Sequence, residues 1–142
     1  MSVPDEIRRQ IQVQAPRERV WTALTDPAEL LRWFPTTACE FDPTPGTPAR
    51  FVWDEGGDEA IVEEVEPAMR LVYRWRPLGS DRPYTTVTFE LTDAGRDGGT
   101  HVALTERGFA ALPDQVHEQS YEGNDAGWRD ELEELRAYLE AA

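Results

Sequence analysis

The 142 residues include fourteen arginines, no lysine and 28 acidic side chains, which give a net charge of −14. This charge argues against nucleic acid and anionic membrane surfaces as partners, because both attract proteins through clustered basic side chains. The length predicts a single domain, residues 1–142, and five Trp, five Phe and four Tyr can supply a sizeable core.

The sequence also bears on the compartment. Cys39 is the single cysteine, so no internal disulfide can form. No basic-plus-apolar leader and no apolar run of membrane-spanning length is present. We therefore expect a cytoplasmic protein. The acidity and the absence of lysine fit either a biased genome composition or a salty environment, and the sequence does not separate these two causes.

The first 34 residues predict one strand and two short helices. Residues 7–13 alternate apolar and polar side chains, as a half-buried strand does. Pro16 suits a first helical turn, and Val20, Trp21 and Leu24 follow at helical spacing. Asp26 ends this helix and can cap a second one, which Pro27 opens and in which Glu29 would complete a capping box.

The rest of the chain predicts six more strands and one long helix. Period-two patterns separated by turn residues place strands at 36–42, 49–54, 59–65, 70–76, 84–92 and 100–107. From residue 113 the pattern is helical, with an apolar stripe at Trp128, Leu132, Leu135 and Leu139. The order predicts an α+β fold in which a curved antiparallel sheet wraps a long helix and leaves space for a ligand.

Four sequence segments carry a family resemblance. They are P-x-x-x-V-W-x-A-L-T-D-P-x-x-L-x-x-W-F at 16–34, V-T-F-E-L at 87–91, G-T-x-V-x-L-T-E-R-G-F at 99–109 and G-W-x-x-x-L-x-x-L-x-x-Y-L at 127–139. Together they resemble the SRPBCC (START-like, helix-grip) superfamily, in the branch similar to the C-terminal domain of the heat-shock protein 90 ATPase activator. The resemblance implies seven antiparallel strands gripping a C-terminal helix around a hydrophobic tunnel.

The sequence contains no motif for metal, cofactor or nucleophilic chemistry. His101 shares strand parity with Ala103 and should face solvent, and His117 lies near the start of the last helix. The spacing of Cys and His residues supports no metal site, and no nucleophile elbow is present. The glycine pairs at 56–57 and 98–99 lie between strands and predict hairpin turns, not phosphate loops. We expect neither a metal nor a cofactor.

Glu106 is the one ionisable residue that strand parity directs inward. If the pattern of Val102 and Leu104 continues, its carboxylate is buried and needs a partner or a proton. It could then act as a general acid or base, or fix the polar group of a ligand. The alternative is that the strand is ending and Glu106 pairs with an arginine at the rim.

Aromatic residues are numerous enough to line a pocket as well as fill a core. For any single one, core packing is the simpler explanation. As a set they exceed what a small core needs, and Trp and Tyr add polar groups suited to an amphipathic ligand. The candidates are Trp33, Phe34, Phe51, Trp53, Tyr73, Trp75, Phe89 and Trp128.

The last helix changes character along its length. Extending its apolar stripe backward from Trp128 reaches Asn124 and Ser120, with Gly123 and Gly127 beside them. Small and polar residues on a core-facing stripe suit the wall of a cavity, and Tyr121 could add a hydroxyl. The alternative is that the helix begins at residue 125 and the preceding segment is a surface loop.

These observations predict a protein that binds a small hydrophobic or amphipathic molecule without catalysis. A first alternative is an enzyme similar to polyketide cyclases and aromatases, with Glu106 as its acid or base. A second is a protein-interaction domain like that of the co-chaperones, although they carry a large N-terminal domain that these 142 residues do not include. An exposed edge strand could pair two copies into a homodimer.

Overall fold

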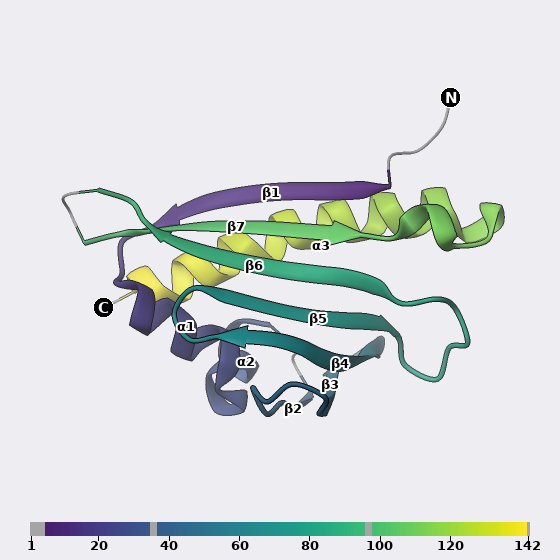
Figure 1. Cartoon of the computed structure of the whole chain (residues 1–142), viewed down its shortest axis with the longest axis horizontal. Coiled ribbons are helices and arrows are strands. Elements are labelled where there is room, and N and C mark those ends of the chain that lie inside the picture. Colours follow the sequence, from purple (N-terminus) through teal and green to yellow (C-terminus); the bar gives the residue numbers. More distant parts are fainter. Residues whose placement is uncertain (1–4, 35–36, 96–97, 142) are drawn as a thin grey trace.

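A seven-stranded sheet and a long C-terminal helix make up the architecture of the protein (Figure 1). The computed structural model describes residues 5–34, 37–95 and 98–141, without the side chains of residues 114–119. The elements in chain order are β1 (Glu6–Val13), α1 (Arg17–Thr25), α2 (Pro27–Trp33), β2 (Ala38–Glu40), β3 (Pro48–Trp53), β4 (Gly56–Glu66), β5 (Arg70–Pro77), β6 (Thr85–Asp93), β7 (Thr100–Arg107), the 3₁₀ turn η1 (Phe109–Ala111) and α3 (Asp114–Glu140).

The strands form one antiparallel sheet in the order β1-β7-β6-β5-β4-β3-β2. The helix α3 runs along one face of this sheet, and α1 and α2 lie near the C-terminal end of α3 (Figure 1). The expected α+β arrangement of a curved sheet around a long helix, with two short helices between the first and second strands, is therefore confirmed.

The helix boundaries settle some of the expectations in detail. Asp26 caps α2, since its Oδ1 accepts the backbone N–H of Ala28 at 2.9 Å. The capping-box role predicted for Glu29 is wrong, because its Oε1 instead accepts hydrogen bonds from Arg19 and from the hydroxyl of Tyr138. The helix α3 begins at Asp114, which excludes a helix start at residue 125. Ser120 and Asn124 thus lie on the same long helix as Trp128.

The strand predicted at 36–42 is shorter in the structure, where β2 covers three residues, and residue 36 lies outside the described part of the chain. The 3₁₀ turn was not predicted. It follows Gly108, whose φ of +108° lets the backbone turn directly after β7. This turn places Phe109 in the core, with none of its surface exposed.

Phe34 is at the centre of the aromatic packing between the sheet and α3. Its ring stacks on Trp128 at 5.6 Å and on Trp75 at 6.2 Å between centroids, and these two indoles stack on each other at 5.2 Å. Trp53 meets the same ring edge-on at 5.1 Å. Such offset and edge-on pairs add specific geometry to the burial of apolar surface. These contacts join the end of α2 to β3, β5 and α3, which are far apart in sequence, in one aromatic cluster.

Candidate functional site

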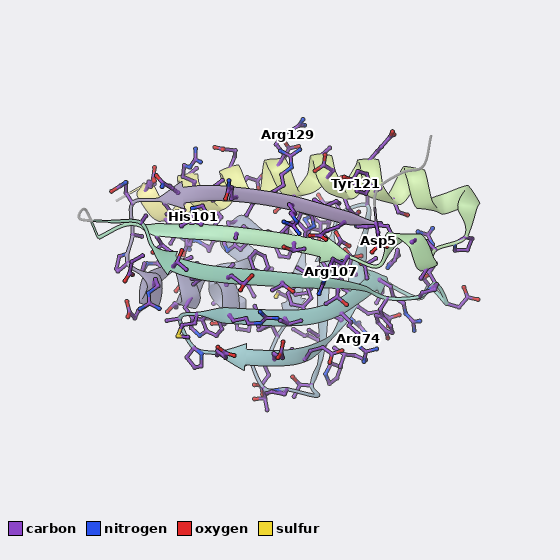
Figure 2. All side chains as sticks on the ribbon, turned by 45° about the horizontal axis from the view of Figure 1, so that its top comes forward. Asp5, Arg74, His101, Arg107, Tyr121 and Arg129 are labelled. Atoms are coloured by element: carbon purple, nitrogen blue, oxygen red, sulfur yellow. The ribbon has the colours of Figure 1, made fainter. Side chains whose placement is uncertain are left out.

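Glu106 is completely buried at the end of β7. The strand alternates buried and half-exposed residues, and Glu106 shares the inward parity of Thr100, Val102 and Leu104. Its neighbours across the ladder are Ile7 in β1 and Val87 in β6. The inward orientation expected from parity is therefore correct. By the same alternation His101 and Arg107 lie on the opposite face, turned away from α3 (Figure 2).

Four side chains donate hydrogen bonds to the Glu106 carboxylate. The indole Nε1 of Trp128 lies 2.8 Å from Oε1, and that of Trp75 lies 2.9 Å from Oε2. The amide nitrogen of Asn124 lies 3.1 Å from Oε1 and 3.0 Å from Oε2. The hydroxyl of Thr85 also donates to Oε2. Both oxygens thus act as acceptors, which suits an ionised carboxylate.

The partners of Glu106 are neutral and come from β5, β6 and α3. The ion pairs found among the described residues include none to Glu106, so the alternative of an arginine partner at the rim is wrong. A buried carboxylate is tolerated when its lone pairs are satisfied by hydrogen bonds. Here those bonds also connect the sheet to the long helix.

A pocket of about 210 Å³ lies between the sheet and α3, next to this network. Its aromatic walls are the cluster around Phe34, with Trp53, Trp75 and Trp128. Its polar groups come from the sheet and from α3. They are Asp58, Asn124 and Glu131. A second pocket of about 70 Å³ shares Asp58, Trp75 and Asn124 with the first, and adds Arg76, Pro77, Arg82, Pro83, Thr85, Phe109, Leu112 and Ser120.

Two glycines of α3 are among the residues that line the larger pocket. Gly123 and Gly127 lie one turn apart in α3, and a Cβ atom built on either would meet nothing within 4 Å. Glycine inside a helix costs about 0.5–1 kcal/mol relative to alanine. Both glycines line the pocket, and no atom of another described segment lies within 4 Å of the point where a side chain would begin, so close packing against another segment does not explain them.

Two acidic residues of the pocket are hard to ionise. Burial, and then the charge of Glu106, raise the pKa of Asp58 to about 7. Burial, followed by the charges of Glu134 and Asp130, raises the pKa of Glu131 to about 8. Glu131 Oε2 is buried and has no hydrogen-bond partner among the described residues. Near neutral pH, both carboxyl groups can exchange a proton readily.

The described residues show neither a candidate metal site nor a candidate membrane span. They contain no group of three or more His, Cys, Asp and Glu side chains that could hold a metal ion. None of the helices in this part of the chain is both long enough and apolar enough to cross a membrane.

A family model described as "Activator of Hsp90 ATPase homolog 1-like protein" matches residues 14–140. The chain belongs to this family. The expected membership of the SRPBCC superfamily, in the branch of the Hsp90 ATPase activators, is thereby confirmed. No curated protein matches the sequence.

Solved structures of the same fold include relatives of the Hsp90-activator-like family. DynU16, described as a putative protein in the dynemicin biosynthetic locus, is 31% identical over 98% of this chain, with a TM-score of 0.81. The match covers 48% of DynU16, so this chain spans about half of that protein. MLL2253 from Mesorhizobium loti is 30% identical over 94% of this chain and 96% of its own, with a TM-score of 0.82. The Aha1 dimer from Colwellia psychrerythraea is 20% identical over 96% of each chain, with a TM-score of 0.78, and it shows the fold alone.

In this member of the Hsp90-activator-like family, the residues predicted to line a ligand site fall into three groups. Those on the walls of the two pockets are Phe34, Trp53, Trp75, Ser120, Asn124 and Trp128. Glu106 lies behind the walls and accepts hydrogen bonds from four lining residues of the two pockets, Trp75, Thr85, Asn124 and Trp128. Those that pack elsewhere are Trp33, Phe51, Tyr73, Phe89 and Tyr121.

The residues that pack elsewhere have partners of their own. Trp33 donates its indole N–H to the Ala23 carbonyl at 2.8 Å. Tyr121 donates its hydroxyl to the Glu6 carbonyl at 3.3 Å, and its position near the start of β1 is visible in Figure 2. Phe51, Tyr73 and Phe89 are buried in the core, where the ring of Tyr73 packs against those of Phe51 and Phe89.

Asp58 and Glu131 were not among the predicted site residues, and the prediction that Glu106 is the single ionisable candidate is wrong. Asp58 has the inward parity of Ala60 and Val62 in β4, but it was missed because the strand was predicted to begin at residue 59, whereas β4 begins at Gly56. Glu131 lies one turn after Gly127 in α3, at the border of the apolar stripe. Its position at the pocket depends on how α3 packs on the sheet, which the stripe alone does not specify.

Replacing the buried acceptor tests the role of the Glu106 network. In Glu106→Gln one oxygen becomes an NH₂ group that faces N–H donors, so we expect a loss of about 1–3 kcal/mol in the free energy of unfolding. Urea denaturation followed by Trp fluorescence measures it. Glu90→Gln, on the exposed outer side of β6, is the control. Equal stability of the two variants would contradict the assigned role.

The raised pKa values predict an unusual effect of pH on stability. Because the folded protein holds protons on Asp58 and Glu131 that the unfolded chain has released, these two groups lower stability as pH rises from about 4 to about 8. We expect Asp58→Asn to gain stability over the wild type with rising pH, measured by urea denaturation at pH 5, 6, 7 and 8. The exposed Asp81→Asn is the control, and a gain that does not change with pH would argue against the raised pKa.

Proposed function

We propose that this protein binds a small amphipathic molecule in the pocket between the sheet and α3. The observation that carries the proposal is the pair of helix-interior glycines, which lowers helix stability and leaves open space beside stacked aromatic rings. Aromatic walls with a few polar groups are typical of ligand pockets. A volume of about 210 Å³ favours a ligand with a single ring system over a long lipid.

The placement of the polar groups supports the same proposal. Asn124 is held by Glu106, and Trp75 and Trp128 are fixed by hydrogen bonds from their indole N–H groups to that carboxylate. The two indole rings, which also stack on each other, are thereby held with little freedom to reorient. A rigid wall of this kind favours binding, because few side chains lose freedom when a ligand enters.

A cyclase-like enzyme is the second candidate. The observation in its favour is Asp58, whose pKa of about 7 is suited to a general acid or base at neutral pH. Glu106 is less suited to this role, since its oxygens are engaged by four side chains. In this alternative the acid–base group is Asp58, and Asp58→Asn would abolish turnover of a substrate that still binds.

The interaction-domain alternative gains less support. Among the described residues the exposed large apolar side chains are Leu31, Met69 and Leu78, which belong to α2 and to two different turns. A homodimer also stays a proposal for this chain, with β1 and β2 as the two edges of the sheet.

Filling the pocket tests the proposed function. In Gly127→Leu the new side chain occupies the open space, so we expect binding of the neutral probe 2-phenylethanol to be lost while the helix is stabilised by about 0.5–1 kcal/mol. Titration of Trp fluorescence, excited where the probe does not absorb, measures binding. Ala137→Leu adds the same side chain at an exposed position of α3 and should bind like the wild type.

Two results would contradict the proposal. One is a wild type that gives no saturable response to 2-phenylethanol or to its charged analogues phenethylamine and phenylacetate. The other is a Gly127→Leu variant that binds it as well as the wild type does.

A further inference from the structure

We propose that the larger pocket selects an organic cation, an amine or quaternary ammonium group attached to a small aromatic body. This inference rests on the proposed function and adds the charge of the ligand. It is carried by two features of the wall, namely the aromatic rings and the two carboxyl groups of Asp58 and Glu131.

The aromatic rings supply the first feature. The pocket is lined by Phe34, which directly follows α2, and by Trp53, Trp75 and Trp128 of β3, β5 and α3. The Trp53 ring stands at 86° to that of Phe34, so the rings line more than one side of the space. Aromatic faces attract cations, and indole does so best. Ring walls on several sides are the recurrent arrangement by which proteins hold ammonium groups.

The carboxyl groups supply the second feature. Asp58 lines the pocket from β4 of the sheet, and Glu131 lines it from the helix α3. Glu131 Oε2 is buried with no hydrogen-bond partner among the described residues, and no ion pair to Asp58 is found among them. A buried acceptor without a donor is costly, and an ammonium group in the pocket would provide one.

The surrounding charges place the cation in the larger pocket. Glu106 in β7 adds negative charge behind the wall, and Asp130 and Glu134 add more along α3. The arginines near Asp58, Arg76 and Arg82, line the smaller pocket instead. Arg76 is paired with Glu59, and Arg82 donates to the hydroxyl of Ser120 at 3.3 Å. The two arginines thus lie at the smaller pocket, whereas Glu131 lies at the larger one.

The protonation of the two acids gives the inference a pH signature. Burial holds the pKa of Asp58 at about 7 and that of Glu131 at about 8, so both are partly protonated at neutral pH. A bound cation stabilises their ionised forms and releases protons. Affinity for a permanent cation should therefore rise with pH from 6 to 8.5, whereas affinity for a neutral ligand should not.

A set of three probes with the same ring separates charge from shape. Phenethylamine, 2-phenylethanol and phenylacetate carry a positive, neutral and negative group, and each is titrated against the Trp fluorescence of the wild type at pH 8. We expect phenethylamine to bind at least about tenfold more tightly than 2-phenylethanol, and phenylacetate to bind most weakly. Equal binding of the amine and the alcohol would overturn the charge preference and leave the proposed function standing. Tightest binding of phenylacetate would overturn it too, and no binding of any probe would overturn both.

Substitutions of the lining residues test whether they cause the preference for a cation. Asp58→Asn and Glu131→Gln should each weaken phenethylamine binding and leave 2-phenylethanol binding close to that of the wild type. Glu122→Gln, an exposed position of α3, is the matched control for charge. Trp53→Leu should weaken the amine more than the alcohol, and Trp21→Leu, a half-buried Trp of α1 away from the pocket, is its control. Acid variants that bind the amine as tightly as Glu122→Gln would overturn the inference.

The pH arm uses benzyltrimethylammonium, whose charge does not change with pH. Its affinity should rise from pH 6 to 8.5 in the wild type, and the rise should disappear in the double variant Asp58→Asn/Glu131→Gln. A flat profile in the wild type would overturn the assigned role of these two groups.

Discussion

The carboxylate of Glu106 is the constraint on which the rest of the structure depends. It is buried and forms no ion pair with the described residues, so its two oxygens need several donors at once. Those donors are side chains of β5, β6 and α3, which can meet the carboxylate only when the helix lies at one position on the sheet. Burying this group therefore specifies how the two layers fit together, in addition to any stability that it contributes.

The same network shapes the pocket. Trp75 and Trp128 direct their indole N–H edges toward Glu106, and their faces stack on each other and on Phe34. Around this rigid wall the chain accepts two destabilising features, the glycines of α3 and the buried acids Asp58 and Glu131. Residues that lower the stability of the fold are typical of functional sites, where they are retained because they serve binding.

Sequence periodicity predicted most of the fold, because strand and helix patterns are local. The inward direction of Glu106 followed from the alternation in β7 and the position of Asn124 from the stripe of α3. The partners of Glu106 could not be predicted, since they depend on packing between elements far apart in sequence. Which aromatic residues fill the core and which line the pocket could not be predicted for the same reason. Trp33 and Trp53 look alike in sequence, yet one is bonded to the Ala23 carbonyl and the other lines the pocket.

The five indole N–H signals in a ¹H–¹⁵N NMR spectrum offer the most direct test of the account. Titration with phenethylamine should shift the signals of Trp53, Trp75 and Trp128, whose rings line the pocket, and leave those of Trp21 and Trp33 in place. The indole N–H hydrogens of Trp75 and Trp128 should also exchange slowly with solvent, because both are buried and hydrogen-bonded to Glu106. Shifts confined to Trp21 and Trp33, or equal for all five, would contradict the account.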